Sequence, residues 1–291
     1  MKRKPVLAIV LVLSVAFLAA VLGLVSRHAS PILNPQGTIA EQEKHLMIVA
    51  TLLMLVVVVP VFILTFGIAW RYRADNLKPV YAPEWDNNPW AESVWWGIPC
   101  LIIGILAVIT WNSSHVLDPS QALASSNQPI TIQVVALQWK WLFIYPGQHI
   151  ATTNYVEFPE NTPVHFEITA DAPMNSFWIP QLGSQIYAMP GMTTQLNLMA
   201  DTAGQYAGSS ANLSGAGFAH MQFTAISTTA PGFDAWVTAA KKSTSHLNAA
   251  EYTNLEQPSE DTPQASYTLA TPDLYDQIMM KFMMPNSPIH D

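Results

Sequence analysis

The residues Leu46–Trp70, "LMIVATLLMLVVVVPVFILTFGIAW", form an apolar run that only Thr51, Thr65 and Gly67 interrupt. A helix that crosses the hydrocarbon core of a membrane needs about 20 predominantly apolar residues, so this run is long enough to span one. Its proline, Pro60, is compatible with a spanning helix, because neighbouring helices or side chains can satisfy the carbonyl group that the proline leaves free.

A second run of the same kind, "VWWGIPCLIIGILAVITW", covers Val94–Trp111. The chain as a whole has a mean hydropathy of +0.22 and only 11% charged residues, whereas about a quarter of the residues of a soluble domain are charged. We therefore predict a transmembrane hairpin over residues 26–111, with helices at about 46–70 and 94–111.

The N-terminus carries a further apolar run, Pro5–Val25, directly after the basic residues "MKRK". A basic start followed by an apolar stretch is typical of a signal peptide, and a run of this length can also remain as a membrane anchor. Residues 1–25 are thus predicted to be a signal peptide or an N-terminal anchor. The run contains no cysteine that could accept a lipid.

Basic residues predict the orientation of the hairpin. Arg71, Arg73 and Lys78 lie between the two spanning runs, and loops rich in lysine and arginine stay in the cytoplasm. Everything after Trp111 is then outside, in a periplasm. This external part has four lysines, no arginine and fourteen acidic residues, a formal net charge of −10. Such an acidic surface argues against nucleic acid or anionic lipid as its partner. The apolar hairpin makes the lipid bilayer a partner of the chain.

Strand patterns follow the hairpin. Side chains alternate between apolar and polar in "ITIQVV" (130–135), "VHFEIT" (164–169), "QLNL" (195–198) and "HMQFTA" (220–225). Short alternating segments separated by turns rich in proline and glycine predict a β-sandwich or barrel, here over residues 112–229. The tail, residues 230–291, is predicted to be helical at "FDAWVTAAKKS" (233–243) and "TPDLYDQIMMKFMMP" (271–285), with an irregular polar segment at 248–264.

Three groups of residues outside the membrane runs could carry chemistry. The first group is four methionines near the C-terminus, Met279, Met280, Met283 and Met284. They could bind copper(I), which favours thioether ligands. A helix face that docks on the sheet explains them better. In a strand, Trp139 and Trp141 would share one face with Lys140 opposite. That pair is either an aromatic floor against a partner or part of the core, and the spacing does not separate the two interpretations.

The third group is the pair His220 and Met221. Neighbours in a strand point to opposite faces, so His220 is predicted to face solvent, Met221 to lie in the core, and neither to share a metal. Cys100, the only cysteine, lies inside the second spanning run, so no disulfide framework exists. The sequence shows no phosphate-binding loop, no paired catalytic carboxylates and no nucleophile with a base. From the residues alone, the chain is a membrane-anchored all-β protein without a catalytic site.

The order of these parts, together with three segments, resembles subunit II of the haem–copper respiratory oxidases. The segments are "QWKWLFIYP" (138–146), "MNSFWIPQLGSQIYAMPGM" (174–192) and "GSSANLSGAGFAHM" (208–221). The resemblance implies an external cupredoxin-like β-sandwich and makes Trp139 and Trp141 an aromatic family motif. In the cytochrome c oxidase members, it also implies a dinuclear copper centre held by two histidines, two cysteines, a glutamate and a methionine.

The ligand positions of that centre do not carry ligands in this chain. By resemblance they fall on Asn175, Ser210, Asn212, Ser214 and Phe218, and Met221 alone is retained. Hydroxyl and amide groups cannot replace bridging thiolates for soft copper. The copper centre is therefore predicted to be absent, and the chain is expected to have no metal, cofactor or catalytic residue of its own.

This pattern of losses resembles the quinol-oxidase branch, the cytochrome bo-type ubiquinol oxidases. The resemblance implies a structural subunit of a proton-pumping terminal oxidase in a bacterial inner membrane, where ubiquinol reduces oxygen to water. It places the haems and the copper in subunit I, and implies subunit I, further small membrane subunits and membrane quinol as partners. The alternatives are a cytochrome c oxidase subunit II and a stand-alone membrane-tethered copper-binding module.

Overall fold

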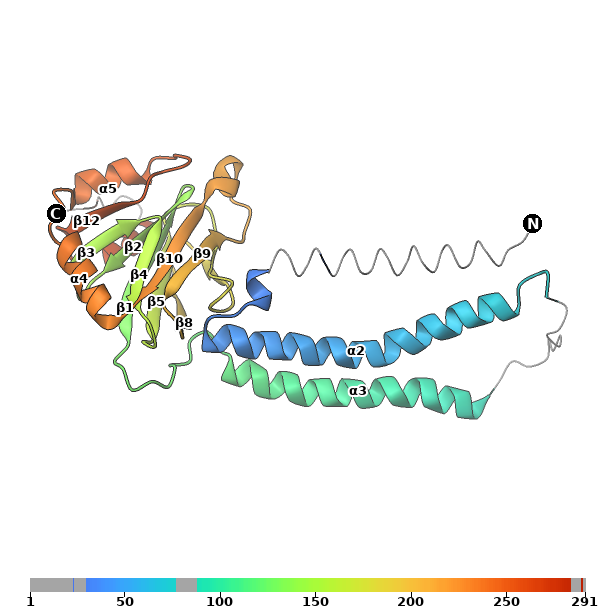
Figure 1. Cartoon of the computed structure of the whole chain (residues 1–291). Helices are drawn as coiled ribbons and strands as arrows, with labels where there is room; N and C mark the ends of the chain where they lie inside the picture. The colour runs from blue at the N-terminus through green and yellow to red at the C-terminus, as the bar shows by residue number, and fades with distance from the viewer. Residues whose placement is uncertain (1–22, 24–29, 77–87, 284–288, 290–291) are drawn as a thin grey trace. The chain divides into compact units, whose positions relative to one another are not determined.

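The computed structural model (Figure 1) describes residues 23, 30–76, 88–283 and 289. The chain divides into two compact units, one made of Gln42–Asp118 and the other of Met1–Glu41 together with Pro119–Asp291. The predicted signal peptide or anchor at residues 1–25 lies outside the described residues except for Gly23.

The first unit contains most of α2 (Thr38–Arg71) and all of α3 (Pro89–Val116). Both helices are long and apolar enough to cross a membrane, and none of the residues in their most hydrophobic windows is buried in the chain itself. The two predicted helices are therefore present, inside slightly longer ones. Helix α3 begins at Asn88, whose side chain accepts hydrogen bonds from the backbone nitrogens of Trp90 and Ala91, 3.1 Å each.

The second unit is a sandwich of two sheets. The larger sheet has the strand order β11 (His246–Leu247), β12 (Ala265–Leu269), β3 (Ile150–Thr153), β2 (Lys140–Tyr145), β1 (Ile130–Leu137), β5 (Val164–Ala170) and β8 (Thr194–Leu198). The smaller sheet has the order β4 (Tyr155–Pro159), β10 (Gln222–Thr228), β9 (Gly204–Ser210), β6 (Asn175–Trp178) and β7 (Ile186–Ala188). The short helical elements are η1 (Pro31–Leu33), η2 (Ala216–His220), α4 (Ala230–Ala240), α5 (Ala249–Glu256) and α6 (Leu274–Met283).

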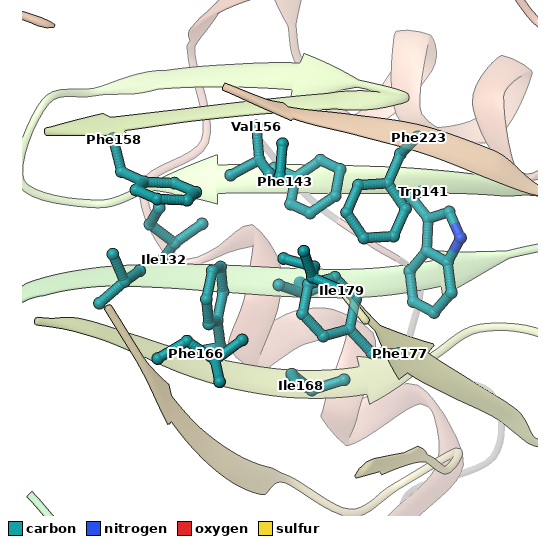
Figure 2. Packing of buried hydrophobic residues seen from close by; sticks show 14 of the residues in the cluster. Ile132, Trp141, Phe143, Val156, Phe158, Phe166, Ile168, Phe177, Ile179 and Phe223 are labelled. Atoms are coloured by element: carbon teal, nitrogen blue, oxygen red, sulfur yellow. The ribbon is translucent and has the colours of Figure 1, made fainter. Parts of the chain in front are cut away.

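The interior of the sandwich is filled by aromatic side chains from both sheets (Figure 2). Trp141 and Phe143 of β2 lie against Phe177 of β6 and Phe223 of β10, with ring centroids 5.2–6.2 Å apart, and the rings of Phe177 and Phe223 stack at 5.0 Å. Such pairs each contribute about 0.5–1.5 kcal/mol beyond the burial of their area. These contacts hold β6 and β10 in place against β2.

The other side of the larger sheet is also buried. Leu142 and Ile144 alternate with the inward residues of β2 and pack in a second cluster with Tyr252, Leu255 and other residues of the C-terminal tail. Because both faces of β2 are covered, its sequence "KWLFIY" is almost entirely apolar rather than alternating. The tail thus forms a third layer on the sandwich.

The tail is not purely helical, which corrects the sequence prediction. Its helices are present, but β12 pairs antiparallel with β3, β11 pairs with β12, and α5 lies within the segment predicted to be irregular, 248–264. Helix α5 buries only Tyr252 and Leu255, too few apolar residues for a visible helical period. The strands of the tail are two and five residues long and depend on the sheet to which they add.

Residues that precede the body of α2 belong to the external unit. The backbone nitrogen of Gln36 donates to the carbonyl of Gln181 at 2.8 Å, and the nitrogen of Asp201 donates to the carbonyl of Gln36 at 2.9 Å. The hydroxyl of Thr38 donates to the Asp201 carboxylate at 2.9 Å. The external domain is therefore built from residues that precede the hairpin in the sequence and from residues that follow it.

A tyrosine hydroxyl group pairs with the backbone of one edge strand of the smaller sheet. Strand β4 is an edge strand, and an edge normally leaves backbone groups unpaired. The Tyr145 hydroxyl accepts a hydrogen bond from the Glu157 nitrogen at 2.8 Å and donates one to the Glu157 carbonyl at 3.0 Å. Both Tyr145 and Glu157 are buried, so water cannot take over these contacts.

We expect Tyr145→Phe to destabilise the external domain by about 1–3 kcal/mol, because it leaves a buried N–H and a buried carbonyl group without partners. Thermal unfolding of the purified protein measures the loss. Tyr187→Phe, at a tyrosine that is 51% exposed, is the matched control and should leave the unfolding temperature unchanged. Equal unfolding temperatures for the wild type and Tyr145→Phe would contradict this role of the hydroxyl.

Candidate functional site

The strands of the smaller sheet bring the predicted ligand positions together. Asn175 begins β6 and Ser210 ends β9; these strands are antiparallel, with Phe177 opposite Ser210. The Ser210 nitrogen donates to the carbonyl of Met221 at 3.1 Å, which closes the loop between β9 and β10. The loop 208–221 is thus an ordered part of the sheet edge.

The polar side chains at these positions bond to one another and to the backbone. The Ser210 hydroxyl donates to Asn175 Oδ1 at 2.9 Å, and Asn175 Nδ2 donates to the carbonyl of Pro173 at 2.7 Å. Asn175 is 1% exposed and Ser210 6%. Nearby, Asn212 Nδ2 donates to the carbonyl of Met174 at 3.0 Å. The site is held by neutral hydrogen bonds.

The remaining three positions differ in their surroundings. The carbonyl of Ser214 accepts a hydrogen bond from Trp139 Nε1 at 3.3 Å, while the Ser214 hydroxyl is buried without a partner among the described residues. Phe218 is half-buried in η2, and Met221 is 1% exposed and packs in the interior cluster. The prediction that Met221 is a core residue is confirmed.

These residues do not fit a dinuclear copper centre. The side chains that converge on the loop offer hydroxyl and amide oxygens and one thioether, and a bridged copper pair requires thiolates. Cys100 lies in α3, in the other unit of the chain. Within residues 30–76 and 88–283, no group of three or more His, Cys, Asp or Glu side chains could hold a metal ion.

The sequence pattern placed His220 in a strand over 220–225, which is wrong, because His220 ends η2 and β10 begins at Gln222. His220 is exposed, as predicted, and its Nδ1 lies 2.9 Å from Asp261 Oδ1. The pair borders an open cavity of about 490 Å³ between the β9–β10 strands and the loop 261–264. At 47% and 75% side-chain exposure, an ion pair of this kind contributes about 0–1 kcal/mol.

The two tryptophans of the aromatic motif do not share a strand face, which corrects the prediction. Trp141 lies in β2 and is fully buried in the interior cluster. Trp139 lies in the turn between β1 and β2, with φ +66°, a left-handed conformation that is rare for a large side chain. The turn rotates Trp139 out of the alternation, because residues outside the strand no longer follow its period of two.

Trp139 instead covers the glycines of the loop. Its ring lies where a Cβ atom at Gly217 would stand, and a Cβ at Gly215 would be 3.3 Å from Trp139 Cζ2. Gly208 is similar, because the ring of Phe223 occupies the place of its Cβ atom. The small residues of the loop therefore make room for two aromatic rings.

Lys140 was expected opposite the tryptophans, and its role was not visible in the sequence. It is 2% exposed, and its Nζ donates to the carbonyls of Leu255 and Gln257 at 2.8 Å each, at the C-terminal end of α5. A cation at this end of a helix is favourable. Burial lowers the pKa of the Lys140 amine.

A second polar contact ties α6 to the sandwich. Lys281 Nζ lies 2.9 Å from Asp171 Oδ2 and 2.8 Å from Glu256 Oε2, and the Tyr252 hydroxyl donates to Asp171 Oδ2 at 2.6 Å. Burial raises the pKa of Tyr252, and the Asp171 carboxylate adds to this increase. Asp171 directly follows β5, so the contact also fixes the start of the segment that leads to Asn175.

The methionines of α6 pack only in part. Met279 packs against the second cluster, the one formed with Tyr252 and Leu255. Met280 is 38% and Met283 59% exposed. Met284 lies outside the described residues. The docking face of α6 is formed by Leu274, Tyr275 and Ile278. The expectation that these methionines form that face is therefore wrong for Met280 and Met283, because the period of the helix turns them away from the sheet.

Comparison with known proteins finds related families and relatives. The family described as "Cytochrome C oxidase subunit II, periplasmic domain" matches residues 146–228, and the family described as "COX Aromatic Rich Motif" matches residues 241–286. "Cytochrome bo(3) ubiquinol oxidase subunit 2" of Pseudomonas aeruginosa is 49% identical over 249 residues, 86% of this chain and 75% of the relative. The Pseudomonas putida protein of the same name is 49% identical over 89% of this chain and 83% of the relative. "Ubiquinol oxidase subunit 2" of Acetobacter aceti is 44% identical over 86% of this chain and 82% of the relative.

We expect Gly217→Ala to destabilise the loop 208–221 by about 1–3 kcal/mol, because the new methyl group overlaps the ring of Trp139. Thermal unfolding and limited proteolysis of the loop measure the effect. Gly147→Ala is the control, since a Cβ there meets nothing within 4 Å. The double variant Gly217→Ala/Trp139→Ala should lose less than the sum of the two single variants, and strict additivity would contradict the contact.

Proposed function

The chain belongs to the family of ubiquinol oxidase subunit 2 proteins, and on this basis we propose that it is a structural subunit without a redox centre of its own. The complete enzyme is a respiratory quinol oxidase. In the proposed assignment, ubiquinol reduces oxygen to water in the complex, and the energy released drives protons across the membrane. This chain contributes assembly and support rather than electron transfer.

The observation that carries this proposal is the hydrogen-bonded network at the loop 208–221. Where a copper-binding relative would need thiolates, Ser210 bonds to Asn175, and the hydroxyl of Ser214 is enclosed. Neutral oxygen ligands do not hold a soft dinuclear copper pair. Electrons from a quinol in the bilayer would enter the complex within the membrane and need no external relay. The haems and the copper of the oxygen site then belong to subunit I.

The hairpin supports a second part of the proposal. The side chains of α2 and α3 are largely exposed and apolar, so lipid or the helices of partner subunits must cover them. The prolines inside them, Pro60 and Pro99, each leave a carbonyl that neighbouring groups can satisfy. We assign α2 and α3 to packing against subunit I and further small subunits in the bacterial inner membrane. The sandwich then caps the complex on the periplasmic side.

Replacing the one retained ligand position tests the absence of a redox role. Met221→Leu keeps the volume and the apolar character of a buried side chain, a change that usually costs less than about 1.5 kcal/mol. We expect the purified complex to keep its rate of quinol oxidation within about twofold and its copper content unchanged. A loss of one copper pair, or a fall in rate of tenfold or more with normal assembly, would show that Met221 is a ligand.

Removing the external domain tests the structural role. We expect a chain truncated after residue 111 to yield little assembled complex, because residues around Gln36 and Thr38 lose their partners in the domain. Haem content and size-exclusion chromatography of the purified membrane complex measure assembly. A complex that forms fully and oxidises quinol at the normal rate without residues 112–291 would rule out the capping role.

A further inference from the structure

Glu157 is a buried carboxylic acid on the edge strand β4. Its strand neighbours Val156 and Phe158 point into the interior cluster, so the Glu157 side chain points to the opposite face of the sheet. It is nevertheless only 8% exposed. A carboxylate in such a place loses its hydration and needs a compensating partner.

Within the described parts of the chain, no ion pair involves Glu157. Strand β10 places Ile226 directly opposite it in the register and the Thr228 hydroxyl two residues further on. The ionisable groups that interact with it are the hydroxyls of Tyr145, from β2, and Tyr155, from β4 itself. Neither of these can stabilise a carboxylate by opposite charge.

Helix α4 closes this edge of the sandwich. It contacts β4 and β12, and its Trp236 packs against Tyr145 and Tyr155, with ring centroids 5.4 and 6.2 Å apart. The charged side chains of α4 and its C-cap, Asp234 and Lys241, are exposed to solvent. Phe233, Val237 and Ala240 bury α4 in the interior cluster. Trp236 joins the helix to the tyrosines that border Glu157.

We propose that Glu157 is a proton-binding site that couples the docking of α4 to the pH of the external compartment. With the carboxyl group protonated, β4 and α4 pack as the structure shows. Ionisation leaves a buried negative charge without a counterion on strand β4. Helix α4, including Trp236, then loosens so that water can reach the carboxylate. This pH-dependent change in α4 does not depend on the path that electrons take through the complex.

The direction of the effect follows from the proton affinity of the folded chain. Burial raises the pKa of Glu157 from 4.5 to about 7, and the neighbouring Thr228 hydroxyl offsets only part of this. Between these two values the folded chain binds a proton that the unfolded chain has released. The contribution of Glu157 to stability is therefore largest below about pH 4.5, falls as the pH rises to about 7, and changes no further above it.

Hydrogen–deuterium exchange of the intact purified complex tests the proposal. After correction for intrinsic rates, we expect the opening of α4 amides to rise about tenfold or more between about pH 5 and pH 9, since one pKa unit corresponds to a factor of ten. The change should take place as the pH rises to about 7 and should level off above it. The amides of α5, which packs on the other face of the larger sheet, serve as the internal reference and should not follow this change.

Two variants complete the test. Glu157→Gln keeps the shape without the charge, so α4 should stay protected and independent of pH. Glu160→Gln, at a less buried carboxylate just after β4, should behave like the wild type. The proposal is overturned if wild-type α4 protection does not change with pH relative to α5, or if Glu157→Gln keeps the wild-type dependence. Because the wild-type series alone can give the first result, the test stands even if Glu157→Gln does not fold.

Discussion

Strand β2 sends Trp141 and Phe143 into the interior of the sandwich and Leu142 and Ile144 into the layer beneath the C-terminal tail. This burial on both faces constrains the rest of the external domain. The inward rings hold the smaller sheet, and the outward aliphatic side chains require a cover. The tail supplies that cover with α5, α6 and two added strands, and it is fixed by the buried Lys140 amine of the same strand.

The loop 208–221 keeps its shape through the same interior contacts. Phe177 and Phe223 stack against each other in the interior, and the ring of Phe223 lies against Gly208 of the loop. The ring of Trp139 lies against Gly217. The bond between Ser210 and Asn175 joins its ends. Packing against aromatic rings and neutral hydrogen bonds therefore order this small-residue loop.

The polar groups buried in the domain have distinct roles. The Tyr145 hydroxyl pairs the backbone of an edge strand, and Lys281 joins α6 to Asp171 and Glu256. In both cases the partners satisfy one another, as buried polar groups normally require. Glu157 differs because its side chain forms no ion pair with any residue that the structure describes. That difference separates a group that stabilises the packing from one that can respond to protons.

The sequence by itself determined the two spanning helices and the strand-rich external region, because apolar length and alternation are local properties. The absence of copper ligands from the loop 208–221 stays a prediction from residue chemistry. The sequence also placed Met221 in the core, since the period of two continues through Phe223. The turn conformation of Trp139, the strands of the tail and the roles of Lys140 and Glu157 were decided by the tertiary structure alone. Each depends on residues distant in sequence, and no local pattern records which side chain lies against Gly217, which strand pairs with β3, or whether a counterion stands near a buried charge.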